Sequence, residues 1–240
     1  MSMPMTLLLF FFPKIFEIKL MGELYHPQRM NLLAFLVDQV LPPRETEAMI
    51  RGVSYEQFSQ NLSPGLRGQG TQAVYSLFPY DDALAQACIL EAKFQDSRTA
   101  AGLLGAALCE FLYEFMSESE PFNPSPPVIV PIPLSQTRLK ERGYNQTERI
   151  AQAALKSGIS IDIQTDLLVR TRSTVPQTSL TGTARRTNVA GAFSACRPCE
   201  WYRTYIVLDD VVTTGHTMLA ACQALRAAGA QRLLPLTLAY

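Results

Sequence analysis

Apolar residues occur along this chain either in short unbroken runs or at helical spacing, and the two patterns alternate from residue 73 onward. A short apolar run bounded by turn residues is typical of a buried strand, whereas apolar positions three or four residues apart predict an amphipathic helix. The clearest pair lies near the C-terminus, where the run 205–208 precedes Met218, Cys222 and Leu225 on one helical face. The predicted elements, in chain order, are strand 73–78, helix 81–94, helix 99–116, strand 128–132, helix 145–156, strand 167–169, strand 205–208, helix 214–228 and strand 232–238.

Strands that alternate with helices favour an α/β fold. We predict a mostly parallel, twisted sheet with helices on both faces and right-handed crossovers, formed by residues 71–240. Ligands bind such sheets at the carboxyl ends of the strands. Residues 1–70 are expected to form a small N-terminal helical and irregular segment. An amphipathic pattern over 31–41 ends at Pro42 and Pro43, and residues 52–70 are rich in turn-forming Gly and Pro.

The composition is that of an intracellular, enzyme-like protein. A length of 240 residues suffices for one full domain and an appendage, and a formal net charge of zero argues against bulk nucleic-acid coating. Five cysteines at irregular spacing fit a reducing compartment, so a cytoplasmic location is expected. The apolar run 7–12 is too short to span a bilayer and is a poor signal peptide, so no membrane partner is expected. It is a short strand, a packing arm, or translated sequence ahead of a start at Met21 or Met30.

Two adjacent carboxylates and a Thr-Thr-Gly turn follow the strand 205–208. Asp209 and Asp210 can accept hydrogen bonds from vicinal sugar hydroxyls or hold Mg²⁺ through water. The turn opens a helix whose N–H groups and positive end suit a phosphate, and Gly215 lets the backbone approach that anion. Threonines on both sides of the glycine add hydroxyl donors. The alternative is an N-cap with favourable dipole charges and no ligand.

Basic side chains gather in two further stretches. Arg138, Lys140 and Arg142 follow the strand 128–132 at every second position. Residues 170–193 contain no acidic residue and four arginines, which are Arg170, Arg172, Arg185 and Arg186. A long loop rich in Thr, Ser, Gly and Arg suits a mobile lid over an anionic ligand, and we assign residues 170–188 to it. The alternative for both stretches is a solvated basic loop.

The string from Tyr205 to Thr217 resembles the phosphoribosyl-pyrophosphate (PRPP) loop of type I phosphoribosyltransferases. The order of further motifs is similar to that of the ComF/GntX family, several members of which are linked to competence and the use of external DNA. These motifs are strand-Pro-hydrophobe-Pro from Val128, Arg-Gly-Tyr-Asn-Gln from Arg142, Gln177, Arg185 with Asn188-Val189, Gly191-Ala192-Phe193 and the PRPP-type loop. The resemblance covers residues 72–239 and is thinner before Val128.

The resemblance implies roles for individual residues. Asp209, Asp210 and Arg185 would be catalytic, with the two aspartates facing the ribose hydroxyls and holding Mg²⁺ indirectly. The PRPP-binding loop would consist of Asp209, Asp210, Val211, Val212, Thr213, Thr214, Gly215, His216 and Thr217. Pyrophosphate and the lid would involve Lys93, Arg138, Arg142, Arg170, Arg185 and Arg186. Lys93 lies in a segment similar to the family's Lys-aromatic segment, although a plain surface lysine is the alternative.

The chain departs from the family in its N-terminal segment, where many members carry zinc-binding Cys-x-x-Cys pairs. Residues 1–87 contain no cysteine and one histidine, His26, whereas a structural zinc needs four N or S ligands. Cys196 and Cys199 form an isolated pair, which a hairpin tip or inert thiols explain as well. No zinc is therefore expected, and residues 1–70 would be a zinc-less counterpart of that module.

Three functions are compatible with these motifs. The first is a phosphoribosyltransferase that uses PRPP and Mg²⁺ to transfer phosphoribosyl to or from a base or amine, in nucleotide salvage or a DNA-uptake context. The second is a PRPP- or nucleotide-sensing regulator without turnover. The third is an accessory of DNA-processing machinery that contacts single strands, although residues 170–192 offer no aromatic ring on which bases could stack. A homodimer is an open alternative to a monomer, and the acceptor base is not indicated.

Overall fold

The computed structural model describes residues 44–119, 125–171 and 191–240. They belong to one compact unit, Arg44–Tyr240, which begins before the boundary that we predicted at residue 70. The predicted helix over 31–41, the apolar run 7–12 and most of the predicted lid, from Arg172 to Asn188, lie outside the described residues.

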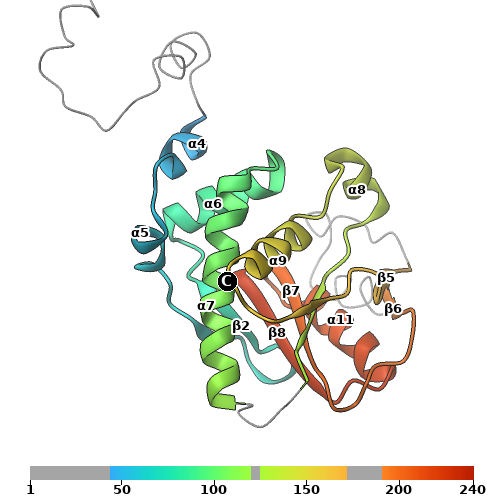
Figure 1. Ribbon diagram of the computed structural model, residues 1–240. Helices are drawn as coiled ribbons and strands as arrows, with labels where there is room; N and C mark the ends of the chain where they lie inside the picture. The colour runs from blue at the N-terminus through green and yellow to red at the C-terminus, as the bar shows by residue number, and fades with distance from the viewer. Residues whose placement is uncertain (1–43, 120–124, 172–190) are drawn as a thin grey trace, which may run out of the picture. The chain divides into compact units, whose positions relative to one another are not determined.

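The elements of this unit run in an order of alternating helices and strands (Figure 1). They are α4 (Glu45–Ile50), α5 (Tyr55–Ser59), β1 (Gly65–Arg67), the 3₁₀ turn η2 (Gly70–Gln72), β2 (Val74–Phe78), α6 (Ala83–Phe94), α7 (Arg98–Ser119), β3 (Val128–Pro131), α8 (Gln136–Arg142), α9 (Gln146–Lys156), β4 (Asp162–Ile163), β5 (Leu168–Arg170), β6 (Phe193–Ala195), β7 (Thr204–Val211), α11 (His216–Ala227) and β8 (Arg232–Ala239).

The main sheet has six strands in the order β1-β2-β8-β7-β3-β4. The pairs β2–β8, β8–β7, β7–β3 and β3–β4 are parallel, and only the edge strand β1 runs antiparallel to its neighbour β2. In the centre of the sheet, Val207 of β7 lies opposite Val130 of β3 on one side and Pro235 of β8 on the other. The predicted α/β fold with a mostly parallel sheet is therefore confirmed.

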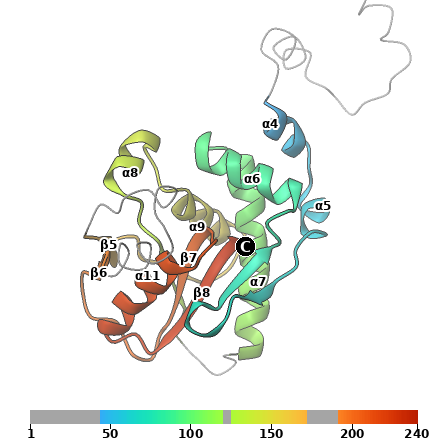
Figure 2. The same cartoon turned by 180° about the vertical axis from the view of Figure 1, so that it is seen from behind.

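Helices cover both faces of this sheet because both faces of its central strands are apolar. Ile206 and Leu208 of β7 belong to the core cluster that contains buried residues of α6, α7 and α9. Tyr205 and Val207 belong to a second cluster with α11, β5 and β6. Figure 1 shows α7 in front of the sheet, and Figure 2 shows β2 and β8 in front of α7 from behind. Successive side chains of a strand point to opposite faces, so the next residues of β7, Asp209 and Asp210, also face opposite sides.

Two local predictions need correction. The strand predicted at 167–169 is β5, which pairs antiparallel with β6 in a separate two-stranded sheet. No helix was predicted in the basic stretch after β3, and a solvated loop was one of its two interpretations. The structure has the helix α8 there. The side chain of Ser135 caps this helix by accepting from the Arg138 N–H, and Gly143 ends it in the left-handed conformation at φ 78°.

The long helix α7 is the centre of the first core cluster. Over Arg98–Ser117 it is long and apolar enough, by length and composition alone, to cross a membrane. In the described unit it packs between α6 and α9 and the sheet, with Leu104, Leu108 and Leu112 fully buried. Its Gly105 lies against the backbone of α9.

The segment before the sheet is held to α6 by a buried acid. Glu91 of α6 is only 2% exposed and accepts two hydrogen bonds from Arg44, at 3.1 and 2.9 Å, and one from Thr46 Oγ1 at 2.6 Å. The bidentate guanidinium and the hydroxyl together compensate the desolvated carboxylate. These bonds, led by the one from Arg44, hold the pKa of Glu91 below its usual value although burial opposes the shift.

We expect Glu91→Gln to lower the free energy of unfolding at pH 7 by about 1–3 kcal/mol, the usual cost of losing a charge-assisted hydrogen bond. Because the folded-state pKa is depressed, this stabilisation is present above the unfolded pKa of about 4.3 and is lost as the pH falls through the folded value. Urea denaturation at pH 7 and pH 3 measures both effects. Glu114→Gln, at an exposed position of α7, is the control, and an equal deficit at both pH values would contradict the prediction.

Candidate functional site

The two aspartates lie in the last residues of β7, at the carboxyl edge of the parallel sheet. Asp210 is 6% exposed and faces α9, and Asp209, on the opposite face, is half-buried. An oxygen of Asp209 accepts from the Asp210 N–H at 2.9 Å, and Asp210 Oδ1 accepts from the Val211 N–H at 2.7 Å. The carboxylates of these adjacent residues thus accept from different backbone N–H groups and present different surroundings to a ligand.

Asp210 is the anion of a compact polar array. Its Oδ2 lies 2.9 Å from Lys93 Nζ at the end of α6 and accepts from Gln146 Nε2 at 2.8 Å. The other end of the Gln146 amide, Oε1, accepts from Arg142 Nη1 at 2.9 Å. Arg142 also lies over the ring of Phe94, 5.0 Å from its centroid. Both carboxylate oxygens of Asp210 therefore have protein partners.

Asp209 has a less favourable environment for its charge. Burial, and then the neighbouring charge of Asp210, raise the pKa of Asp209 to about 7, and Lys93 acts against this shift. Burial, and then the charge of Arg138, lower the pKa of Arg170 at the end of β5. The negative charge of Asp209 acts in the opposite direction. A cationic ligand group or a sugar hydroxyl at Asp209 would relieve its unpaired charge.

Basic groups from separate segments converge on the two aspartates. The charges of Arg138 and Arg142 act on each other, and Arg138 also acts on Arg170. Burial lowers the pKa of Arg142, while the charge of Asp210 acts in the opposite direction. These like charges repel one another, and a multiply charged anion would offset that repulsion.

The loop after β7 leads directly into α11. Gly215 is the N-cap residue of this helix and has the left-handed φ of 70°, which glycine adopts without strain. A Cβ at Gly215 would lie 3.4 Å from Gln72 Cβ, an ordinary van der Waals contact, so the positive φ is what disfavours a larger residue. Among the described residues no side chain caps the helix, which leaves its positive end for an anion. Both ring nitrogens of His216 are buried without a hydrogen-bond partner within the described part of the chain.

The structure brings together most of the residues that the sequence selected. Lys93 contacts Asp210, the charges of Arg142 and Arg170 interact with those of the aspartates, and Arg138 acts on both arginines. The loop Asp209–Thr217 has the predicted strand-to-helix geometry. Arg185 and Arg186 lie outside the described residues. The roles of all these residues in PRPP binding stay predictions.

Sequence reasoning did not assign a role to the polar residues that follow Arg142. Gln146 contacts Asp210, Tyr144 contacts the end of α6, and Asn145 Nδ2 donates to the Ile132 carbonyl at 3.1 Å. The motif Arg-Gly-Tyr-Asn-Gln was noted only as a family resemblance. The sequence did contain a signal for the role of Gln146. This polar residue directly follows the N-cap Asn145 and lies on the apolar face of the helix, where a glutamine needs a hydrogen-bond partner.

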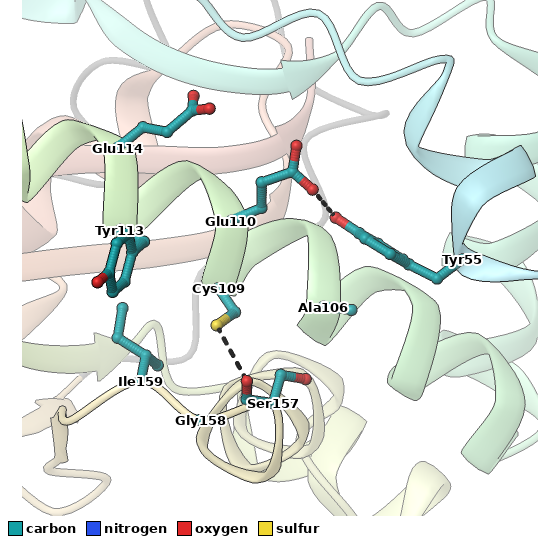
Figure 3. Close-up of a pocket in the computed structure, with 9 residues that line it drawn as sticks. All are labelled: Tyr55, Ala106, Cys109, Glu110, Tyr113, Glu114, Ser157, Gly158 and Ile159. Atoms are coloured by element: carbon teal, nitrogen blue, oxygen red, sulfur yellow. Dashed lines mark hydrogen bonds between the residues drawn. The ribbon is translucent and has the colours of Figure 1, made fainter.

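A cavity of the described residues lies away from the aspartates. It encloses about 480 Å³ beside α7 and the end of α9, and Figure 3 shows Tyr55, Glu110, Cys109 and Tyr113 around it. The hydroxyl of Tyr55 donates to Glu110, and Cys109 Sγ lies 3.8 Å from the Ser157 carbonyl. A second cavity of about 330 Å³ lies between η2 and α11 and touches Gly215. Among the described residues no three His, Cys, Asp or Glu side chains are grouped as a metal cage, and the zinc expectation stays a prediction.

Fold and site together define an α/β protein with an acidic pair and a helix N-terminus at the carboxyl edge of a parallel sheet, facing basic side chains. The chain is 34% identical over 110 residues to Competence protein F of Haemophilus influenzae, which is 45% of this chain and 48% of that protein. It is 35% identical over 105 residues to the DNA utilization protein YhgH of Escherichia coli K12 (44% and 45%) and over 130 residues to YhgH of Salmonella typhi (53% and 56%). These relatives support the predicted membership of the ComF family. The chain spans about half the length of the curated relatives it matches, and no family model matches it.

Proposed function

We propose that this protein binds PRPP with Mg²⁺ and transfers phosphoribosyl to or from a base or amine. The observation that carries the proposal is the contact of Lys93 with Asp210 and the link from Asp210 through Gln146 to Arg142, beside the α11 N-terminus. The charge of Arg170 also interacts with that of Asp209. PRPP combines vicinal hydroxyls with a phosphate and a pyrophosphate. The site offers acceptors for hydroxyls and two separate sets of donors for phosphates.

Each part of the ligand has a counterpart in the site. The N–H groups at the start of α11, and the hydroxyls of Thr213 and Thr214, would bind the 5′-phosphate. Asp209 would accept hydrogen bonds from the ribose hydroxyls, because both oxygens of Asp210 already have protein partners. The guanidinium groups of Arg142 and Arg170 would hold the pyrophosphate and stabilise its charge as the glycosidic bond breaks.

The residues present fit a Mg²⁺ ion that is coordinated mainly by the phosphates of a bound substrate and by water. Mg²⁺ commonly takes one or two carboxylates, several waters and substrate phosphates instead of a protein cage. Asp209 supplies one accessible carboxylate, and the described residues supply no further acidic group beside it except Asp210. When bound, the metal would shield the charge of the phosphates, while the protein residues orient the ribose and hold the leaving group.

The biological context comes from the relatives. Their names concern competence and DNA utilization, so we place the reaction in the recovery of nucleotides or bases from DNA taken up by the cell. The arginine-rich site would bind small phosphorylated products of that DNA.

Arg138→Met is expected to weaken PRPP binding about tenfold, because an exposed cation beside Arg142 and Arg170 is lost from the pyrophosphate side of the site. Lys140→Met removes the same charge from the same exposed helix. It should change affinity much less, because Arg138, and not Lys140, is among the charges that shift the pKa of Arg142 and Arg170. Titration calorimetry with PRPP, with and without Mg²⁺, measures both. Failure of the wild type to bind PRPP, or equal losses in the two variants, would overturn the proposal.

A further inference from the structure

The turn between α8 and α9, residues 142–146, connects the parts of the site to one another. Arg142 stacks on Phe94, Tyr144 binds the end of α6, Asn145 binds the end of β3, and Gln146 binds the end of β7. Gly143 allows this course by taking the left-handed conformation that ends α8. Neighbouring residues thus reach α6, β3 and β7, of which α6 and β7 carry the candidate ligand-binding groups Lys93 and Asp210.

Gln146 occupies the centre of these contacts. It is 3% exposed, and its amide is used at both ends: Nε2 donates to Asp210 at 2.8 Å, and Oε1 accepts from Arg142 at 2.9 Å. A carboxylate acceptor and a guanidinium donor fix the orientation of the amide, since the reverse orientation would place donor against donor and acceptor against acceptor. A buried amide that is satisfied in this way is rigid.

Tyr144 fixes the neighbouring lysine. Its hydroxyl donates to the Ala92 carbonyl at 3.0 Å and accepts from the Asp96 N–H at 2.8 Å, so it bridges the two sides of the helix end that contains Lys93. Asp96 has a φ of 48°, which is uncommon for a residue other than glycine, and Arg149 contacts its carboxylate at 3.3 Å. The end of α6 is therefore held in one conformation by side chains of the segment that follows α8.

We infer that Gln146 is a positioning residue: it sets the relative placement of the Asp210 carboxylate and the Arg142 guanidinium, and so of the ribose and pyrophosphate sides of the site. This inference rests on the proposed PRPP binding. Gln146 itself is not expected to touch the ligand, because both ends of its amide are occupied by Asp210 and Arg142. Removing the amide would leave Arg142 with its stacking on Phe94 but without the hydrogen bond that links it to Asp210. It would leave Asp210 with Lys93 and the Val211 N–H as its partners among the described residues.

The test compares Gln146→Met with Gln152→Met on the same helix, where Gln152 is exposed and contacts only Glu148. PRPP affinity is measured by titration calorimetry in the presence of Mg²⁺, and folding is checked by the melting temperature. We expect a loss of about tenfold or more for Gln146→Met and no change for Gln152→Met. A residue with a purely structural role would lower the melting temperature and leave the affinity of the folded protein unchanged.

A double-mutant cycle with Arg142→Met identifies the route of the effect. If Gln146 acts by placing Arg142, the double variant should bind PRPP little worse than Arg142→Met alone. Full additivity of the two losses would overturn the inference, as would equal affinity of wild type and Gln146→Met.

If the wild type itself binds no PRPP, the proposed function fails first and the inference fails with it. Should Gln146→Met not fold, Gln146→Glu keeps the shape and the acceptor for Arg142 but opposes Asp210 with a second acid, and unchanged affinity in that variant would refute the inference.

Discussion

Gly105→Ala is expected to destabilise the protein by about 1–3 kcal/mol, the usual cost of overpacking a well-packed core. Gly105 is buried in α7 where this helix crosses α9. A Cβ added there would lie 2.6 Å from Ala153 Cβ and 2.8 Å from the backbone nitrogen of Ala154. The nearest atoms belong to a short side chain and to backbone, so no rotamer change can relieve the contact, and the helices must separate. The gain in helix propensity from Gly to Ala, about 1 kcal/mol, is smaller than this cost.

Gly102 offers a matched control one turn earlier in the same helix. It is exposed, and an added Cβ would meet no atom within 4 Å. Gly102→Ala should therefore stabilise the protein by about 0.5–1 kcal/mol, through helix propensity alone. Urea denaturation of both variants against wild type measures the pair. Stabilisation by both substitutions would mean that α7 and α9 are not in the close contact described.

Local patterns predicted the parts of this molecule that depend on neighbouring residues. The apolar run before Asp209 predicted β7, and its alternation also determines that Asp209 and Asp210 face opposite sides of the sheet. The strand-to-helix turn at Gly215 followed from the same short segment. The helix α8 was missed because three basic residues at every second position do not have helical periodicity, although Ser135 and Gly143 are ordinary cap residues.

The convergence of the site could not be derived from such patterns. Gln146 and Asp210 are 64 residues apart, and periodicity indicates which face a side chain occupies but not which distant group it meets. Lys93 was selected only through the family resemblance, and on the helical pattern alone it was indistinguishable from a surface lysine. The strand order β2-β8-β7-β3 places the ends of α6 and α9 beside the end of β7, and only this topology explains why Lys93, Gln146 and Asp210 meet.

The different surroundings of the two aspartates lead to the prediction that the same substitution will have opposite effects on stability. Asp210→Asn removes the charge that pairs with Lys93 at 2.9 Å, and Lys93 is only 25% exposed. We expect a loss of about 3 kcal/mol in the free energy of unfolding, as for other buried ion pairs from which one partner is removed. Asp209→Asn removes a carboxylate whose pKa is raised to about 7 by burial and by Asp210.

A carboxyl group with a raised folded-state pKa destabilises the folded protein progressively as the pH rises from the unfolded value, about 3.9, towards the folded value. Asp209→Asn should therefore be more stable than wild type at pH 8, by about 1–3 kcal/mol, and the difference should disappear near pH 4. Lys93, Asp210 and Arg170 are the charged groups that interact with Asp209, and they are unchanged in the variant. Both substitutions should weaken PRPP binding at least tenfold, because each removes or displaces a charged group of the site. Urea denaturation at pH 4 and pH 8 measures the stability differences, and titration with PRPP and Mg²⁺ measures binding. We assign Asp210 as the acid held by protein partners and Asp209 as the acid that faces the ligand. Equal destabilisation by the two variants at pH 8 would refute this assignment.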